Sequence, residues 1–328
     1  MVSLAPLLSL PSLEDDLARV EKALLANVRT GDPFLAEVAA HLITAGGKRL
    51  RPALAVAVGE LGGGPADDDV IMGAVAVELV HLGSLYHDDV MDEARTRRNV
   101  DSVNARWGNL VAILAGDFLL ARASEIAASL GTEVAGLLAA TIGKLCEGQV
   151  RELAQTFDVT RSEESYLLSL AGKTAALMST ACRVGAITAR LDRPGVDALT
   201  AYGERVGMVF QIVDDILDVV ATDEELGKPA GNDLVEGVYT LPVIRALASA
   251  ESSDTLRRLL GSPLERDQVE AARAIIRSNG AVPAAVDVAR RYARESVEAL
   301  GGVSGVEPVL SALGTLGDHL IENIPVRA

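Results

Sequence analysis

A short acidic string occurs twice in this chain, and its residue types point to divalent-metal chemistry. The first copy reads Asp88-Asp89-Val90-Met91-Asp92, and the second reads Asp214-Asp215-Ile216-Leu217-Asp218. Both copies lie in long apolar stretches without proline, so we expect both to be helical. Residues three and four positions apart lie on one side of a helix, so the three carboxylates of each copy are predicted to share one face.

Three like charges on one turn of an apolar helix repel one another, and a hard divalent cation would relieve that repulsion. The first copy also lies near a predicted helix C-terminus, where the helix dipole disfavours anions. A solvated acidic face is the alternative, but two copies with the same spacing make it the weaker interpretation. We therefore predict six metal ligands: Asp88, Asp89, Asp92, Asp214, Asp215 and Asp218.

The densest basic run is Gly46-Gly47-Lys48-Arg49-Leu50-Arg51-Pro52. Paired glycines permit a close backbone approach, and the basic side chains that follow can donate to phosphate oxygens. A helix C-cap followed by solvated basic residues is the alternative. Arg97 and Arg98 come soon after the first acidic string and can reach an anion held by the same metal. These residues indicate a site for an anionic substrate.

Two further positions lie one or two helical turns before an acidic string. His81 precedes Asp88 by two turns, so it is either a core residue or a ligand of the same site. Gln211 precedes Asp214 by about one turn and is predicted to lie beside it.

The string Gly172-Lys173-Thr174 falls in the middle of a predicted helix. A glycine inside a helix costs about 1 kcal/mol relative to alanine, so we expect Gly172 to have a packing or kinking role. Lys173 is either functional or a lysine whose stem covers apolar surface while its amine reaches water.

The elements that position these residues are predicted to be helices throughout. Apolar residues recur three and four positions apart, proline is sparse, and strand-like alternation is rare, so we predict an all-α fold. Ser12 and Asp15 predict a capping box for a helix ending near Val28, and Pro33 opens a second helix ending near Thr44. Further helices are predicted over 107–128, 132–154 and 162–191, then a loop over 224–233 and amphipathic helices from 241 onward.

Composition narrows the class of protein. The chain has 328 residues, 49% of them hydrophobic, and no linker divides it, so we predict a single domain over residues 1–328. A net charge of -16 argues against nucleic acid binding. Cys146 and Cys182 show no metal-ligand spacing and indicate a reducing compartment, so we expect a cytoplasmic protein. We expect neither a signal peptide nor a transmembrane helix.

The two acidic strings resemble the first and second aspartate-rich motifs of the trans-isoprenyl diphosphate synthases, and the resemblance covers nearly the whole chain. It implies an all-α bundle of the isoprenoid synthase type around a central cavity. It also implies a prenyltransferase that condenses isopentenyl diphosphate with an allylic diphosphate, head to tail and in trans. About three Mg²⁺ ions would hold the allylic diphosphate between the two motifs.

The same resemblance distributes roles among the other site residues. Substrate binding falls to Lys48, Arg51, His81 and Arg98 for isopentenyl diphosphate, and to Arg97 and Lys228 for the allylic diphosphate. Catalytic roles fall to Lys173, Thr174 and Gln211. The chain departs from the family pattern at Asn99 and Asp101, which replace a glycine and a proline, and at Val238, where many members carry a basic residue.

In the implied mechanism, the metal ions, Lys173, Arg97 and Lys228 stabilise the leaving diphosphate as the C–O bond breaks. The alkene of isopentenyl diphosphate attacks the resulting cation, and proton loss regenerates an allylic product. Analogy with the family also predicts a homodimer, and release of the product suggests peripheral contact with a membrane.

Product length is predicted from the turns before Asp88, which would line the tunnel for the growing chain. Gly83 and Ser84 lie about one turn below the aspartates and are small, and Val80 and Val77 lie deeper on the same face. Tyr86 is expected to point to another face. We therefore predict a long-chain product of the heptaprenyl to decaprenyl range, with geranylgeranyl or farnesyl diphosphate as the alternative.

Three other kinds of protein fit the motifs less well. A class I terpene cyclase usually lines its pocket with aromatic residues, and only 3% of this chain is aromatic. A phosphohydrolase built on His87-Asp88 needs further histidine ligands, but His41, His81 and His319 are scattered. A non-catalytic partner subunit is expected to have degraded aspartate motifs, and both motifs are intact here.

Overall fold

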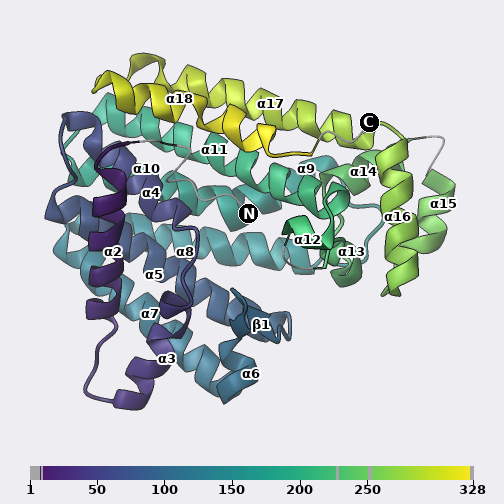
Figure 1. Ribbon diagram of the computed structural model, residues 1–328, viewed down its shortest axis with the longest axis horizontal. Helices are drawn as coiled ribbons and strands as arrows, with labels where there is room; N and C mark the ends of the chain where they lie inside the picture. Colours follow the sequence, from purple (N-terminus) through teal and green to yellow (C-terminus); the bar gives the residue numbers. More distant parts are fainter. Residues whose placement is uncertain (1–7, 9, 227–228, 250–252, 326–328) are drawn as a thin grey trace.

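The computed structural model describes residues 8, 10–226, 229–249 and 253–325. Within these ranges the chain is almost entirely helical (Figure 1). The strands in the described ranges are two short segments, β1 (Thr96–Arg97) and β2 (Val100–Asp101), which pair antiparallel. The prediction of an all-α fold is confirmed.

The first half of the chain carries the basic string and the first acidic string. Its helices are α2 (Leu13–Asn27), α3 (Pro33–Thr44), α4 (Leu50–Gly59), η1 (Glu60–Gly62), α5 (Asp68–Met91), α6 (Val103–Trp107), α7 (Asn109–Ser129) and α8 (Thr132–Leu153).

The second half carries the second acidic string. Its helices are α9 (Glu163–Leu170), the π-helical turn η2 (Ala171–Ala175), α10 (Ala176–Thr188), α11 (Arg193–Val220), α12 (Asp223–Leu226), α13 (Asn232–Glu236), α14 (Leu241–Ala248), α15 (Ser253–Leu259), α16 (Arg266–Ser278), α17 (Ala281–Ala299), η3 (Leu300–Gly302) and α18 (Glu307–Glu322).

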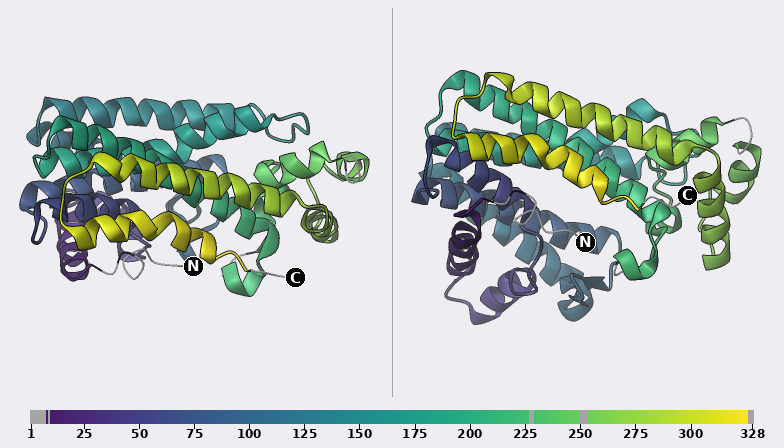
Figure 2. Two further views of the ribbon diagram at one scale, coloured as in Figure 1. Left: turned by 90° about the horizontal axis from the view of Figure 1, so that it is seen from above. Right: turned by 45° about the horizontal axis from the view of Figure 1, so that its top comes forward.

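Two long helices, α5 and α11, position the two acidic strings. Helix α5 packs against α4, α7 and α10, and α11 packs against α10 and α17. Helices α8, α10, α11, α17 and α18 run roughly side by side, with α2 crossing at one end and α16 standing across the other (Figures 1 and 2). Most buried apolar side chains of the described residues form one core that extends from Leu8 to Leu320, and Ala221, Leu226 and Ala230 form a small second cluster. The predicted single domain requires such a core, and the domain assignment stays a prediction.

The ends of α5 and α11 follow from their sequences. The side chain of Asp67 caps α5 by accepting a hydrogen bond from the backbone N–H of Val70 at 2.9 Å, and Asp192 caps α11 in the same way through Gly195 at 2.9 Å. Helix α5 ends at Met91, with Asp92 as its C-cap residue. The first acidic string therefore closes its helix, as its position in the sequence predicted.

The predicted capping box at Ser12 is wrong. Ser12 has helical backbone angles (φ -87°, ψ -17°) and makes no side-chain capping hydrogen bond. An N-cap residue usually needs an extended backbone to turn its side chain toward the first free N–H groups of the helix. The Ser12 side chain instead counteracts the rise that burial causes in the pKa of the Glu60 carboxyl.

Three predicted boundaries also change. Residues 107–128 do not form one helix with Trp107, because Gly108 adopts φ 89° between α6 and α7. The helix predicted over 162–191 contains the π-helical turn η2 and ends at Thr188. The loop predicted over 224–233 includes parts of the short helices α12 and α13, while its residues 227–228 lie outside the described ranges.

By length and composition alone, α5 is apolar enough to cross a membrane. However, 72% of its apolar window is buried inside the protein. Its apolar character is accounted for by its place in the core.

Candidate active site

The first acidic string divides its three carboxylates between two environments. Asp89 is fully buried, and one of its oxygens accepts a hydrogen bond from Nε of Arg97 at 2.7 Å and lies 2.6 Å from Nη2 of the same ion pair. Within the described ranges, the carboxylates of Asp88 and Asp92 have no hydrogen-bond partner, although the backbone N–H of Asp92 donates to the carbonyl oxygen of Asp88 at 2.8 Å. Burial raises the pKa of Asp88 to about 6, and the nearby charge of Lys173 opposes that rise.

The second acidic string is divided in a similar way. Asp215 is buried and accepts hydrogen bonds from Tyr166 Oη at 2.6 Å and Gln211 Nε2 at 2.8 Å. Burial raises its pKa to about 7, although both hydrogen bonds oppose the rise. Asp218 is also buried and accepts from the backbone N–H groups that open α13, at 3.3 and 3.2 Å. Asp214 is half-buried and has no hydrogen-bond partner in the described part of the chain.

The three carboxylates of each string therefore do not share one environment, which corrects the single-face prediction. Successive residues turn by about 100° around a helix axis, so the second aspartate of each string turns toward the core. Asp88 and Asp92, four positions apart, remain toward one side. Asp214 is the corresponding residue of the second string.

Lys173 and Thr174 lie on the π-helical turn η2, opposite the first acidic string. Lys173 Nζ donates to Glu152 Oε1 at 2.5 Å and interacts electrostatically with Asp88 and Asp92. Burial lowers the pKa of Lys173, but these three carboxylates outweigh burial and raise it. Lys173 therefore stays positively charged beside Asp88, Asp92 and Glu152.

A chain of hydrogen bonds connects η2 to the second acidic string. Thr174 Oγ1 donates to Gln211 Oε1 at 2.9 Å, and the amide of Gln211 donates to Asp215. Tyr166 completes the chain from α9. This arrangement confirms that Gln211 lies next to the second acidic string.

The π-helical turn is packed directly on α8. A Cβ atom added at Gly148 would lie 2.5 Å from the backbone nitrogen of Lys173, and one at Gly172 would lie 2.9 Å from the carbonyl oxygen of Lys144. The two backbones touch because neither glycine has a side chain. The packing role predicted for Gly172 is confirmed.

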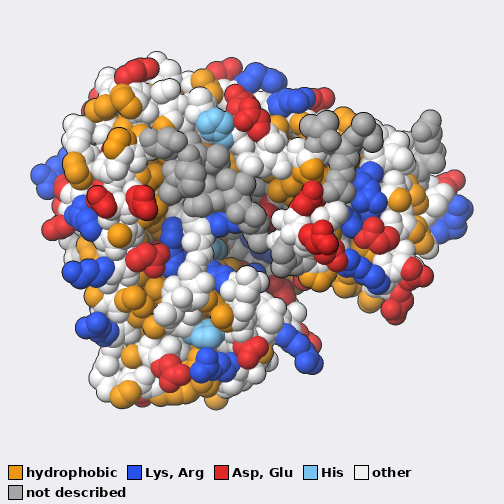
Figure 3. Space-filling view, in the orientation of Figure 1, with side chains coloured by type: hydrophobic (Ala, Val, Ile, Leu, Met, Phe, Trp, Pro, Cys, Tyr) orange, Lys and Arg blue, Asp and Glu red, His pale blue; other side chains and the backbone are white. Residues whose placement is uncertain are grey.

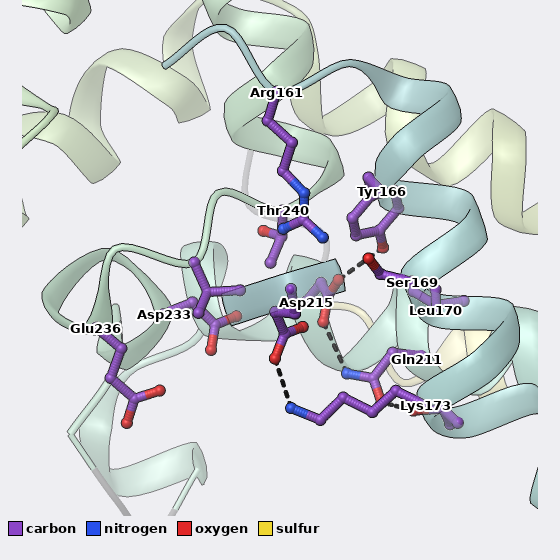
Figure 4. A pocket seen from close by; sticks show the side chains of 13 residues that line it. Arg161, Tyr166, Ser169, Leu170, Lys173, Gln211, Asp215, Asp233, Glu236 and Thr240 are labelled. Carbon is purple, nitrogen blue, oxygen red and sulfur yellow. Dashed lines mark hydrogen bonds and ion pairs between the residues drawn. The ribbon is translucent and has the colours of Figure 1, made fainter. Parts of the chain in front are cut away.

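Two cavities border α11 at the second acidic string. A cavity of about 110 Å³ is lined by Glu152, Arg161, Tyr166, Ser169, Leu170, Lys173, Thr174, Gln211, Asp215, Asp233, Glu236, Val238 and Thr240 (Figure 4). A second cavity, of about 200 Å³, includes Lys48 and Asp214 in its lining. The structure thus brings Lys173, Thr174, Gln211 and Asp215 together around one cavity, and Lys48 and Asp214 around the other.

Two of the predicted isopentenyl diphosphate residues, Arg51 and Arg98, lie close to buried Glu78. Arg98 lies 3.7 Å from Glu78 and donates to the Leu42 carbonyl oxygen at 2.8 Å. Burial lowers the pKa of Arg51 to about 10, and its Nε has no hydrogen-bond partner in the described ranges. Burial, with Arg51 and Arg98, also holds the pKa of His81 well below its usual value. On the face shown in Figure 3, Lys and Arg side chains gather around a central recess.

Gly47 explains the paired glycines of the basic string. It has φ 149°, and a Cβ atom there would lie 2.7 Å from Cζ of Arg98. The backbone of the basic string therefore packs directly on the Arg98 guanidinium. The predicted contribution of Lys228 lies outside the described residues.

Known proteins of similar sequence identify the family of this chain. The sequence profile described as polyprenyl synthetase matches residues 32–276. The chain is 39% identical over 307 residues to the nonaprenyl diphosphate synthase of Mycobacterium tuberculosis, which covers 93% of this chain and 91% of that one. The chain belongs to the polyprenyl synthetase family.

Solved structures agree with this assignment. The decaprenyl diphosphate synthase of Rhodobacter capsulatus superimposes with a TM-score of 0.88 at 34% identity, covering 98% of both chains. The geranylgeranyl pyrophosphate synthase of Corynebacterium glutamicum, complexed with calcium and isoprenyl diphosphate, gives 0.84 at 40% identity, covering 95% of this chain and 96% of that one. This polyprenyl synthetase is therefore an all-α trans-prenyltransferase, as its acidic strings predicted.

Sequence reasoning missed several residues that support the site of this polyprenyl synthetase. Glu78 is a buried acid beneath the predicted substrate arginines, and Arg49 donates to it at 3.0 Å from a left-handed backbone conformation (φ 46°). A lone glutamate within the apolar stretch before Asp88 was the available signal for Glu78. Glu152 and Tyr166, which hydrogen-bond to Lys173 and Asp215, were also not predicted, because no local sequence pattern distinguishes them.

The structure revises one predicted chain-length residue of this polyprenyl synthetase. A Cβ atom at Gly83 would lie 3.1 Å from the Gly116 carbonyl oxygen, so Gly83 permits close packing on α7, where an open tunnel wall was predicted. Val77 and Val80 are fully buried in the core. Ser84 is half-buried, and its hydroxyl donates to the His81 carbonyl oxygen at 2.9 Å.

Tyr86 points away from this face, as predicted. Its hydroxyl donates to the backbone carbonyl oxygen of Val38 on α3, at 2.8 Å.

Proposed function

We propose that this polyprenyl synthetase condenses isopentenyl diphosphate with an allylic diphosphate, head to tail and in trans, with Mg²⁺ as its metal. The observation that carries the proposal is the set of carboxylates without a hydrogen-bond partner in the described ranges: Asp88, Asp92 and Asp214. Lys173 interacts with the first two but hydrogen-bonds elsewhere. Unbonded carboxylates beside a fixed lysine suit an anion that is joined to the protein through a cation.

The donor set fits a hard divalent cation. Among the described residues, no three His, Cys, Asp or Glu side chains lie close enough to hold one ion by themselves. Each ion would take one or two carboxylates from the protein, with substrate phosphates and water completing its shell, as Mg²⁺ commonly does. The structure from Corynebacterium glutamicum contains calcium, which supports the use of a divalent ion.

Within this proposal, Asp88, Asp92 and Asp214 are the direct metal ligands, and about three ions bind. Asp89, Asp215 and Asp218 hold Arg97, Gln211 and the start of α13 in position through their hydrogen bonds. When bound, Mg²⁺ would neutralise charge on the leaving diphosphate.

The protein residues divide the reaction between two substrates. Lys173, Arg97 and Lys228 bind the allylic diphosphate and stabilise its charge as the C–O bond breaks and the electron pair leaves with the diphosphate. Thr174 and Gln211 position the allylic end of the substrate through their hydrogen bond to Asp215. A new C–C bond forms from the isopentenyl alkene, and the proton lost in that step goes to the released diphosphate.

Isopentenyl diphosphate binds at the basic side of the site. Arg51, Arg98 and Lys48 supply charge, and His81 stays neutral and hydrogen-bonds, because burial and the arginines lower its pKa. Glu78 and Glu21 offset only part of the charge of the three arginines around them, counting Arg49. An excess of buried positive charge favours a polyanionic ligand.

The homodimer we propose forms through α7 and α8. Helix α7 exposes Leu110, Ile113 and Leu114 (72%, 41% and 56% exposed), and α8 exposes Val150 and Leu153 (64% and 50%). Large exposed apolar side chains gathered on two adjacent helices are typical of an interface. A Leu110→Glu/Leu114→Glu variant is expected to change the mass in light scattering from dimer to monomer. A monomeric wild type, or a variant that stays dimeric, would exclude this interface.

We propose that the protein acts in the cytoplasm and releases its product at a membrane surface. Cys146 and Cys182 are both free thiols, which supports a reducing compartment.

The proposed product is a long-chain polyprenyl diphosphate. Incubation with isopentenyl diphosphate, separate allylic starters and Mg²⁺, followed by chromatography of the dephosphorylated products, is expected to give chains in the heptaprenyl to decaprenyl range. Removing Mg²⁺ with a chelator is expected to abolish product formation. A wild-type enzyme that stops at geranylgeranyl diphosphate would contradict the proposed length but not the reaction.

A Ser84→Phe variant tests where the growing chain runs. Ser84 lies one turn before Asp88 and is only half-buried, so a phenyl ring there is expected to shorten the product. Ser84→Ala is the matched control, since it removes the hydroxyl without adding bulk. Unchanged product length in Ser84→Phe would show that the chain runs elsewhere.

A further inference from the structure

A buried arginine lines the smaller cavity without using all of its donors. Arg161 precedes α9 and is 5% exposed. Its Nη1 donates to the Tyr239 carbonyl oxygen at 3.1 Å, and its guanidinium lies over the Tyr166 ring at 5.5 Å. In the described part of the chain, its Nε and Nη2 have no hydrogen-bond partner. Buried charged donors are normally paired, so two unused donors on one guanidinium call for an acceptor.

Two buried hydroxyls line the same cavity and share this property. Ser169 and Thr240 are 2% and 3% exposed, and the described residues offer neither side-chain oxygen a hydrogen-bond partner. The three side chains come from three separate segments, namely the residue pair before α9, α9 itself and the N-cap position of α14 (Figure 4). Their convergence on one space indicates a site that receives a ligand with several acceptor oxygens.

The charges around the cavity narrow the class of ligand. Arg161 interacts with Glu152 and Asp215 only through space, without a salt bridge to either. Lys173 contributes a second cation to the lining, which also carries the carboxylates of Glu152, Asp215, Asp233 and Glu236, so a phosphoryl group would enter it together with a divalent cation. A cavity of about 110 Å³ is several times the roughly 10–15 Å³ that a cavity needs to hold one water, so it can admit a phosphoryl group. Guanidinium and hydroxyl donors are typical partners of phosphate oxygens.

We propose that Arg161, together with Ser169 and Thr240, binds a phosphoryl group of the diphosphate that Lys173 binds directly and that Asp214 holds through the metal. This inference rests on the proposed function and adds a binding residue to it. In this role Arg161 retains inorganic diphosphate as well as the allylic substrate.

The test measures binding of inorganic diphosphate with Mg²⁺ by calorimetry, and KM for each substrate separately. Arg161→Ala is expected to weaken diphosphate binding and raise the allylic KM by about tenfold or more, as expected for loss of a charge-assisted contact, with little change in the isopentenyl KM. Arg257→Ala is the matched control, because its guanidinium bonds the Val159 carbonyl oxygen of the same segment at 3.2 Å but lies outside the cavity lining.

A second-site variant distinguishes a role of the Arg161 charge in diphosphate binding from a structural role of its side chain. In Arg161→Ala/Val238→Lys, a lysine enters the same cavity from another segment and is expected to restore most of the diphosphate affinity. A merely structural arginine would not be replaced in this way. Thr240→Val removes only an unbonded hydroxyl and is expected to weaken diphosphate binding severalfold without unfolding.

Wild-type diphosphate affinity in Arg161→Ala, or no recovery in the double variant, would overturn the proposal. Failure of the proposed function gives a different pattern. In that case the wild type forms no prenyl product from isopentenyl diphosphate, whereas Mg²⁺-dependent diphosphate binding still depends on Arg161.

Discussion

Asp214→Ala is expected to lower kcat/KM for the allylic diphosphate by about 10³-fold, with the helical content unchanged. Asp214 is half-buried, and none of the described residues hydrogen-bonds to its carboxylate, so its removal leaves no internal donor unpaired. The loss is therefore confined to the metal-bound substrate. Asp88→Ala is expected to behave in the same way for the same reason.

Steady-state rates across a Mg²⁺ titration measure this effect, and circular dichroism checks the fold. The half-maximal Mg²⁺ concentration is expected to rise in Asp214→Ala. Asp197→Ala is the matched control, because Asp197 is an exposed carboxylate on the same helix, paired with Arg183 at 2.8 Å. Near-normal turnover in both Asp88→Ala and Asp214→Ala would remove the basis for the metal assignment.

The sequence predicted the acidic strings well because helical spacing fixes which residues lie close together. It did not predict that Asp89 and Asp215 turn inward, because the side of each helix that faces the core depends on neighbours distant in sequence. Asp89 pairs with Arg97 from a separate hairpin, and Asp215 pairs with Tyr166 from α9. The division into available and engaged carboxylates is thus a tertiary property.

The residues that hold the basic string in place could not be predicted either, because they are also distant in sequence. Arg49 reaches both Glu21 and Glu78, which lie 28 and 29 residues away along the chain. The sequence shows where the glycines are, but not which group packs against each of them. Gly83 was predicted to leave a tunnel open, but α7 occupies the space beside it. A missing side chain marks close approach without identifying the approaching group.

The position of Lys173 depends on Gly148 of the neighbouring helix α8. Gly148→Ala is expected to lower kcat by about 10²-fold, although Gly148 contributes no functional group to the site. The added Cβ atom would lie 2.5 Å from the Lys173 backbone nitrogen and 2.9 Å from the Gly172 carbonyl carbon. Both atoms belong to the backbone, so no side-chain rotation relieves the contact and η2 must shift. That shift moves Lys173 and Thr174 together.

Thermal unfolding, kcat and the KM of each substrate test this prediction. Overpacking is expected to destabilise Gly148→Ala by about 1–3 kcal/mol, and the better helix propensity of alanine offsets at most about 1 kcal/mol. Gly314→Ala on α18 is the matched control, because a Cβ atom there has no neighbour within 4 Å. It is expected to keep full activity. If Gly148→Ala loses stability but retains wild-type kcat, then α8 stabilises the bundle without positioning Lys173, and the π-helical turn holds that lysine by itself.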